Sequence, residues 1–159
     1  QNLWIYTADC MPIFFADKYQ RRIAAIRCGR KGLEKNIITN AIKSFEIMGS
    51  SRKDILVSIG PSISGDKYTL DKEAIKNLFC ENNGSLSNKV NENINTLNNF
   101  ESIPFDIKNY AYQQLIMENV DPSNIEISNK CTYSLPNEFH SWRRSKNDKR
   151  QWSVICTSI

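Results

Sequence analysis

The sequence predicts a single α/β domain spanning residues 1–159. Short apolar runs typical of buried strands alternate with stretches in which apolar residues recur every three or four positions, as in helices. This length is enough to bury a core, and neither an internal repeat nor a linker divides the chain. The hydrophobic share of 40% and the charged share of 24% are those of an ordinary globular protein.

The first third of the sequence predicts three strands followed by a helix. Residues 3–6 and 12–16 are apolar runs on either side of a short polar turn. Residues 22–26 follow a second turn, so we expect them to pair with 12–16 as a hairpin. Apolar residues at helical spacing then predict one helix over residues 33–48, which Gly49 ends.

The remaining elements alternate between strands and helices. Residues 54–59 read as a strand that ends in a Gly/Pro/Ser loop, and Asp71 caps a short helix that ends near residue 79. Asp106 caps a further helix to about residue 119. Residues 124–128 and 151–156 are the last two predicted strands.

Two segments carry no such periodicity. Eight of the 19 residues in 81–99 are Asn, which predicts a loop or a polar insertion. Residues 131–141 are expected to be irregular.

The charge distribution favours small anionic ligands over nucleic acids. The formal net charge is +4, and the basic residues gather in three short stretches, 18–22, 27–31 and 143–150. A nucleic-acid binder usually presents a larger continuous basic face. We therefore expect no nucleic-acid partner.

The five cysteines predict free thiols in a reducing compartment. Their number is odd, and no two are spaced as Cys-x-x-Cys. No secretory signal opens the sequence, and no run approaches the roughly 18 apolar residues that would span a membrane. We expect a cytoplasmic protein with no membrane partner. The sequence opens inside a strand without an initiator Met, so we also expect it to lack an N-terminal part.

Cys10 is the first candidate functional residue. It follows Asp9 at the end of a predicted strand, within the sequence Thr-Ala-Asp-Cys-Met-Pro. A thiol in this position is a candidate nucleophile or metal ligand. The alternative is a buried structural cysteine.

Two groups of arginines are candidate anion ligands. Arg27 and Arg30 flank a glycine turn that opens a predicted helix, where free N–H groups can approach an anion. Arg143 and Arg144 lie beside aromatic residues and could grip a phosphate or a carboxylate bidentately. The alternative for the first group is an ordinary solvated turn.

Taken in order, these motifs resemble the YfiH-like family, whose members are also called laccase-domain proteins. That family shows a Thr-Ala-Asp-Cys-x-Pro strand end, a His-Ala-Gly-Trp-Arg-Gly turn, a Gly-Pro-x-Ile segment, Cys-Thr and a closing Ser-Tyr-Arg-Arg stretch. The matching segments here are 7–12, 29–33, 59–63, 106–107, 114–115, 131–132, 139–144 and Arg150.

The resemblance implies a fold, a metal and an activity. The fold is a four-layer α/β/β/α arrangement with mixed sheets. Two histidines and the motif cysteine, which is Cys10 here, hold a zinc ion and in some members copper. The activities are phosphorolysis of adenosine, inosine, guanosine and methylthioadenosine, together with deamination of adenosine. A nucleoside and phosphate are therefore the expected partners, and an oligomer is compatible with the resemblance.

One departure from the family pattern affects the metal site. Arg27 stands where the family has its motif histidine, and an arginine, which stays protonated, cannot ligate zinc. One hypothesis is a compensating site of Cys10, Cys28 and His140, since two thiolates and an imidazole suit zinc. The favoured interpretation makes Arg27 an anion ligand or the ion-pair partner of Asp9.

Three functional hypotheses follow. The first is a purine nucleoside phosphorylase with adenosine deaminase activity. The second is a catalytically degenerate relative that binds a nucleotide, another anion or a protein partner. The third is a metal-free cysteine hydrolase that acts on peptidoglycan precursors through Cys10. The candidate catalytic residues are Cys10 and Asp9, and the candidate substrate or phosphate ligands are Arg27, Arg30, Arg143 and Arg144.

Overall fold

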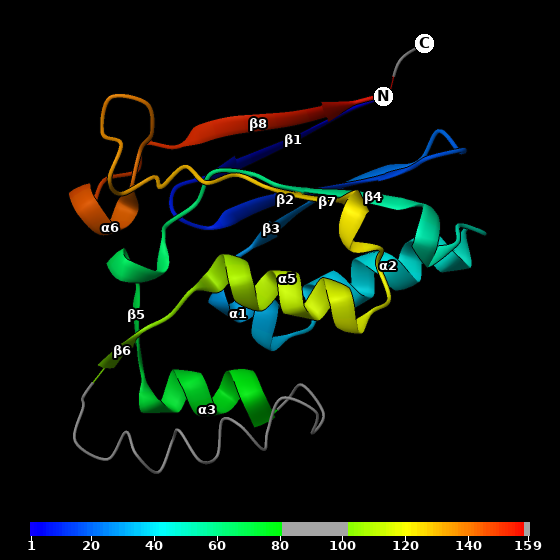
Figure 1. Ribbon diagram of the computed structural model, residues 1–159. Helices are drawn as coiled ribbons and strands as arrows, with labels where there is room; N and C mark the ends of the chain where they lie inside the picture. The colour runs from blue at the N-terminus through cyan, green and yellow to red at the C-terminus, as the bar shows by residue number, and fades with distance from the viewer. Residues whose placement is uncertain (81–101, 158–159) are drawn as a thin grey trace.

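A four-stranded mixed sheet forms the centre of the molecule. The computed structural model describes residues 1–80 and 102–157, so the Asn-rich segment 81–99 lies outside the described residues (Figure 1). The strand order is β3-β2-β4-β7, with β2 antiparallel to both neighbours and β4 parallel to β7. The strands are β2 (Met11–Asp17), β3 (Ile23–Cys28), β4 (Ile55–Ile59) and β7 (Ile125–Ile127).

A two-stranded ribbon lies on one face of this sheet. The first strand, β1 (Asn2–Thr7), pairs antiparallel with the last, β8 (Gln151–Cys156), so the two ends of the chain meet. The ribbon contacts β3 and lies on the side of the sheet opposite the helices (Figure 1). Its outward face carries exposed aromatic rings, including Trp4 and Trp152.

Helices cover the other face of the sheet. Helix α3 lies beyond the others, next to a small two-stranded sheet of β5 and β6 (Figure 1). The helices are α1 (Arg30–Glu34), α2 (Ile37–Ile47), α3 (Lys72–Cys80), α5 (Ile107–Met117) and the short α6 (Trp142–Ser145), and the small strands are β5 (Thr69–Asp71) and β6 (Ser102–Pro104). Single 3₁₀ turns are η1 (Arg52–Asp54), η2 (Gly65–Lys67) and η4 (Pro122–Asn124).

The core lies between the sheet and the helices. Alternate side chains of β2 point into it and are completely buried, as the two-residue period of a strand requires. They meet one apolar side of α2 and of α5. The largest fully buried side chains are Phe15, Phe45, Met11, Ile13, Leu33, Ile38, Ile42, Ile55, Ile59, Ile63, Leu78 and Leu115.

The expected α/β class and mixed sheet are confirmed, and so is the hairpin of β2 and β3. Residues 1–80 and 102–157 contain the ribbon, the four-stranded sheet and a layer of helices, with α3 and the small β5–β6 sheet beyond that layer (Figure 1). Within the same two ranges, no helix is both long and apolar enough to cross a membrane.

One predicted helix is wrong in its extent. The apolar period predicts a single helix over 33–48, but the structure breaks it between α1 and α2 at Asn36. The Asn36 backbone is left-handed, with φ 53°, a conformation that Asn tolerates better than most residues. Gly49, with φ 91°, ends α2 as expected.

The predicted helix caps are confirmed. The Asp106 carboxylate accepts hydrogen bonds from the backbone N–H groups of Lys108 and Asn109 at the start of α5. The Asp71 carboxylate accepts one from Ala74 at the start of α3, 2.7 Å away.

Candidate functional site

A tight turn between β1 and β2 positions Asp9 and Cys10. Asp9 has φ 80°, and its carboxylate oxygens accept hydrogen bonds from the Thr132 hydroxyl and from the Arg143 backbone N–H, each 2.7 Å away. The Asp9 carbonyl oxygen accepts a third hydrogen bond, from Ile63 N–H at 3.0 Å. Asp9 therefore joins this turn to two segments far away in the sequence.

The Cys10 sulfur lies between a glycine and an arginine. An Nη atom of Arg27, at the end of β3, donates a long hydrogen bond to Cys10 Sγ at 3.7 Å. A Cβ atom added at Gly29 would lie only 2.7 Å from the same sulfur, so this close approach requires glycine. Cys10 is half-buried, whereas Arg27 is exposed.

A cleft of about 300 Å³ opens beside Cys10. It is formed by the β1–β2 turn, the end of β3, the segment before β5, and the start of α6 together with the loop that follows it. The side chains are mainly cationic and aromatic, with one thiol and one carboxylate. The lining residues are Ala8, Asp9, Cys10, Arg27, Tyr68, Trp142, Arg143 and Arg150.

The two aromatic rings of the cleft each contact a cation. The Arg143 guanidinium carbon lies 4.8 Å from the centre of the Tyr68 ring, and Lys146 Nζ lies 3.8 Å from the centre of the Trp142 ring. Burial raises the pKa of Tyr68 even though Arg143 and Arg30 act to lower it. Tyr68 therefore stays a neutral phenol at physiological pH and can donate a hydrogen bond.

Two of the four arginines predicted to bind an anion have other partners. The Arg144 guanidinium donates to three backbone carbonyls, those of Thr132 and Tyr133 at 2.6 Å and of Phe139 at 2.7 Å. Arg30 pairs with Glu34 one turn further along α1. Neither residue lines the cleft, whereas Arg150 does.

Comparison with known proteins identifies the family. Residues 1–158 match the family model described as multi-copper polyphenol oxidoreductase laccase. The chain belongs to this laccase family. The YfiH-like resemblance of the motifs is thereby confirmed.

The relatives of this laccase-family chain include several purine nucleoside phosphorylases. One from Synechocystis sp. is 29% identical over 99% of the chain and 64% of the relative. YlmD from Bacillus subtilis, also named purine nucleoside phosphorylase, is 32% identical over 87% of the chain and 48% of the relative. The chain thus spans about half to two thirds of the length of these relatives.

Solved structures of proteins named YfiH and YlmD share the fold of the chain. Bacillus licheniformis YfiH superposes with a TM-score of 0.83 at 25% identity, over 96% of the chain and 56% of that protein. YlmD from Geobacillus stearothermophilus gives a TM-score of 0.78 at 22% identity, with the same coverage of 96% and 56%.

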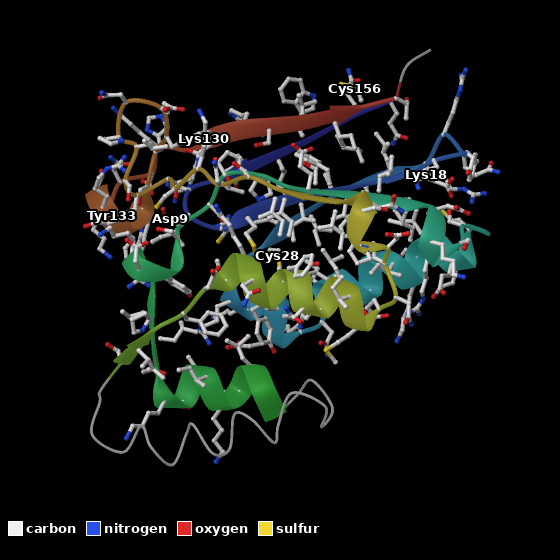
Figure 2. All side chains as sticks on the ribbon, viewed as in Figure 1. Asp9, Lys18, Cys28, Lys130, Tyr133 and Cys156 are labelled. Atoms are coloured by element: carbon white, nitrogen blue, oxygen red, sulfur yellow. The ribbon has the colours of Figure 1, made fainter. Side chains whose placement is uncertain are left out.

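The described residues do not fit the metal that the laccase-family name implies. Cys28 is fully buried, and burial, with a smaller effect of Cys10, raises the pKa of its thiol far above the ordinary range. Figure 2 shows Cys28 on the helical side of the sheet. His140 is exposed and does not line the cleft; its backbone N–H donates to Gln151.

The compensating site of Cys10, Cys28 and His140 is therefore not assembled. Among residues 1–80 and 102–157, no group of three or more His, Cys, Asp or Glu side chains could hold a metal ion. The Arg27 guanidinium, a fixed positive charge, lies against the one thiol that faces the cleft. We derive no step through zinc or copper.

The structure also corrects the expected ion pair of Arg27 with Asp9. Both oxygens of the Asp9 carboxylate already accept hydrogen bonds from Thr132 and Arg143, and Arg27 donates to Cys10 instead. Tyr68 was absent from the candidate set; it lies just before a three-residue strand, and no pattern around it marks a site. Trp142 lies inside the matching segment 139–144, and this motif could have indicated it as a site residue.

Proposed function

We propose that the protein is a purine nucleoside phosphorylase that binds its nucleoside and phosphate in the cleft beside Cys10. One observation carries the proposal: the cleft combines three guanidinium groups with two aromatic rings. Guanidinium groups suit a phosphate, and aromatic rings suit a flat purine. The names of the relatives support the same activity, although they are longer proteins.

The phosphate end of the cleft is formed by Arg27, Arg143 and Arg150. Arg150 is oriented by its own hydrogen bonds to the carbonyls of Asn147 and Lys149, at 2.9 and 2.8 Å. The three fixed positive charges attract a phosphate dianion and reduce its electrostatic repulsion from other anionic groups.

The purine end is formed by Trp142 and Tyr68. Trp142 is 46% exposed, so one part of its ring is open to a ligand. A nucleobase that packs on the indole gains apolar contact, and the neutral Tyr68 hydroxyl is a donor for a ring nitrogen or a ribose oxygen.

The proposed reaction is a substitution at the ribose. A phosphate oxygen attacks C1′ while the bond from C1′ to the purine N9 breaks, and the electron pair of that bond stays with the base. The base takes up the proton that the hydrogen phosphate loses, and the products are a free purine and ribose 1-phosphate. The protein contributes by holding the two reactants together and by neutralising phosphate charge.

Asp9 and Cys10 have different places in this proposal. Asp9 fixes the turn that forms the floor of the cleft, because its carboxylate is engaged on both oxygens. Cys10 lies at the anion end, against Arg27. The proposal also keeps Asp9 and Cys10 as the candidate catalytic residues.

The proposed substrates are adenosine, inosine, guanosine and methylthioadenosine, with deamination of adenosine as a second reaction. The proposed compartment is the cytoplasm, because Cys10, Cys28, Cys131 and Cys156 are all free thiols.

A non-catalytic relative that binds the same anion is the second candidate. It is favoured by the lack of a metal-holding group among the described residues and by the Arg27 side chain beside Cys10. A cysteine hydrolase has less support, since the part of the chain that the structure describes places no evident base at Cys10: Arg27 donates to its sulfur, and the Asp9 carboxylate accepts hydrogen bonds from Thr132 and Arg143.

A product assay tests the proposal. Purified protein is incubated with adenosine, with and without phosphate, and adenine, inosine and hypoxanthine are separated by chromatography. We expect adenine that appears only with phosphate. Inosine without phosphate would instead support the deaminase, and no product beside an active relative would support the binding protein.

A further inference from the structure

We propose that the Cys10 end of the cleft is a metal-independent phosphate site in which Arg27 and Arg143 provide the main contacts. The proposal rests on the proposed function and deepens it, because it assigns the phosphate of phosphorolysis to named residues. The ligand class is a tetrahedral phosphate dianion, either free or as a sugar phosphate.

The cleft has an excess of positive charge. Arg27, Arg143 and Arg150 line it, against the single carboxylate of Asp9. In the part of the chain that the structure describes, none of these three arginines forms an ion pair with a carboxylate. An anion that enters the cleft therefore has no competing protein carboxylate to displace.

The two principal arginines keep donors for a ligand. Arg27 is exposed, and the contact that holds it is a 3.7 Å hydrogen bond to a sulfur, which is a weak acceptor. The Arg143 guanidinium carbon lies over the Tyr68 ring, 4.8 Å from its centre. A ring is not a hydrogen-bond acceptor for all five guanidinium N–H groups, so N–H groups stay available for bidentate contacts to phosphate oxygens.

Backbone geometry holds Arg143 at this place. Its N–H donates to the Asp9 carboxylate at 2.7 Å, so α6 starts on the turn that carries Cys10. Arg27 reaches the same point from the end of β3. Arg27 and Arg143, from distant parts of the chain, thus line the same cleft as Cys10.

The same geometry argues against a metal ion at this position. A divalent cation at Cys10 would have to lie against the Arg27 guanidinium, and the described residues supply no group of three or more His, Cys, Asp or Glu side chains to hold it. An anion is attracted by the charge that repels the cation. The site therefore suits an anionic ligand, whereas the family name implies a metal cation.

Cys10 can report occupancy of the site. It is half-buried, and a phosphate held by Arg27 would cover its sulfur. Cys156 is exposed at the far end of β8, away from Asp9 (Figure 2), and serves as an internal control. Cys28, which is fully buried, reacts slowly as long as the protein stays folded.

The test is the rate of Cys10 alkylation by iodoacetamide, measured peptide by peptide with mass spectrometry. The reaction is run with increasing inorganic phosphate, always in the presence of a chelator. We expect phosphate to slow the alkylation of Cys10 about tenfold at ten times its Kd, because the free fraction falls that far, and to leave Cys156 unchanged. A parallel series with ribose 1-phosphate shows whether the site takes the free anion or the ester.

Arg27→Gln and Arg21→Gln form a matched pair of variants. Arg27 is exposed, so its replacement leaves the fold intact, and Arg21 is an exposed arginine in the turn before β3. We expect Arg27→Gln to weaken phosphate protection about tenfold or more and Arg21→Gln to leave it unchanged. Protection is taken as the ratio of rates with and without phosphate, since the loss of Arg27 also changes the thiol itself.

Three results would overturn the proposal. In the first, phosphate slows the alkylation of Cys10 no more than that of Cys156. In the second, protection needs a metal ion and disappears in chelator. In the third, protection is undiminished in Arg27→Gln. Phosphorolysis without protection would refute this phosphate site, and with it the phosphate end of the cleft assigned above, while the phosphorylase activity itself stands. Protection without phosphorolysis would refute the proposed function while this site stands.

Discussion

At the scale of single residues, Cys10 packs closely against Gly29 beside the cleft. A Cβ atom added at Gly29 would lie only 2.7 Å from the Cys10 sulfur, which also contacts the Arg27 side chain. The position of the Cys10 thiol therefore depends on the absence of a side chain at Gly29 as much as on the hydrogen bond from Arg27. A change at Gly29 should move the thiol without touching any charged group.

The first prediction concerns Gly29→Ala. We expect a loss of about 1–3 kcal/mol in the free energy of unfolding, because the added methyl overlaps the Cys10 sulfur, together with an altered rate of Cys10 alkylation. Gly49→Ala is the control: it strains a residue with φ +91° and costs stability of similar size, but should leave the Cys10 rate unchanged. Equal Cys10 rates in Gly29→Ala and the parent would contradict the packing.

Cys131 gives a pH-dependent prediction. Burial acts to raise the pKa of its thiol, but hydrogen bonds from Ser134 and Ser64 outweigh it and lower the pKa from 9.0 to about 7; the Ser64 hydroxyl is 3.0 Å from the sulfur. A lowered folded pKa stabilises the protein fully above pH 9, the unfolded value, and this stabilisation is lost as the pH falls through 7.

We therefore expect the free energy of unfolding to rise by about 2 kcal/mol between pH 7 and 9, relative to a Cys131→Ser variant measured alongside. Urea denaturation at several pH values measures it. Parallel pH profiles for the two proteins would show that Cys131 is a neutral thiol across this range.

Sequence patterns identified several of these residues but not their partners. The motif around Cys10 and the arginine at position 27 are visible in the sequence, whereas the contact between them depends on the hairpin register. The partners of Asp9 are Thr132 and Arg143, more than 120 positions away, which no local pattern reveals. Cys28 and His140 satisfied the chemistry of a zinc site but not its geometry.

At the scale of elements, the loop before α6 is held by Arg144. Its guanidinium joins the carbonyls of Thr132, Tyr133 and Phe139, and Figure 2 shows Tyr133 at the same end of the molecule as Asp9. The same loop presents the Thr132 hydroxyl to the Asp9 carboxylate. Arg144 thus acts on the cleft through the backbone rather than by contact with a ligand.

Neighbouring arginines on α6 allow a matched test of this difference. Arg144→Lys should cost about 2 kcal/mol of unfolding free energy, because an ammonium cannot reach all three carbonyls in the planar geometry of a guanidinium. Arg143→Lys should change stability by less than about 1 kcal/mol but weaken phosphate protection of Cys10. Thermal denaturation and the alkylation assay measure the two effects, and a reversed order would contradict the assigned roles.

Element prediction from sequence succeeded where the apolar period was long. The strands of the main sheet, the ribbon strands and the caps at Asp71 and Asp106 agree with the structure. It failed at Asn36, because the apolar spacing continues through a residue whose backbone leaves the helix. The three-residue strands β5 and β6 and the four-residue α6 are too short to produce a period.

At the scale of the whole molecule, the cleft lies at the end of the layers rather than within one of them. It receives residues from the β1–β2 turn, from β3, from the segment before β5 and from α6, which only the complete fold brings together. The sequence predicted the α/β class and the mixed sheet, and family membership confirms them. The pairing of β1 with β8 joins segments about 150 positions apart, between the two ends of the cleft-bearing sequence.

The central claim is that Arg27 makes this cleft a phosphate site for phosphorolysis. The most direct measurement is the rate of adenine formation from adenosine and phosphate, in chelator, by the parent and by Arg27→Gln. We predict adenine formation that requires phosphate, persists in chelator and falls about tenfold or more in the variant. No phosphate-dependent adenine from the parent, or equal rates in the two proteins, would contradict the claim.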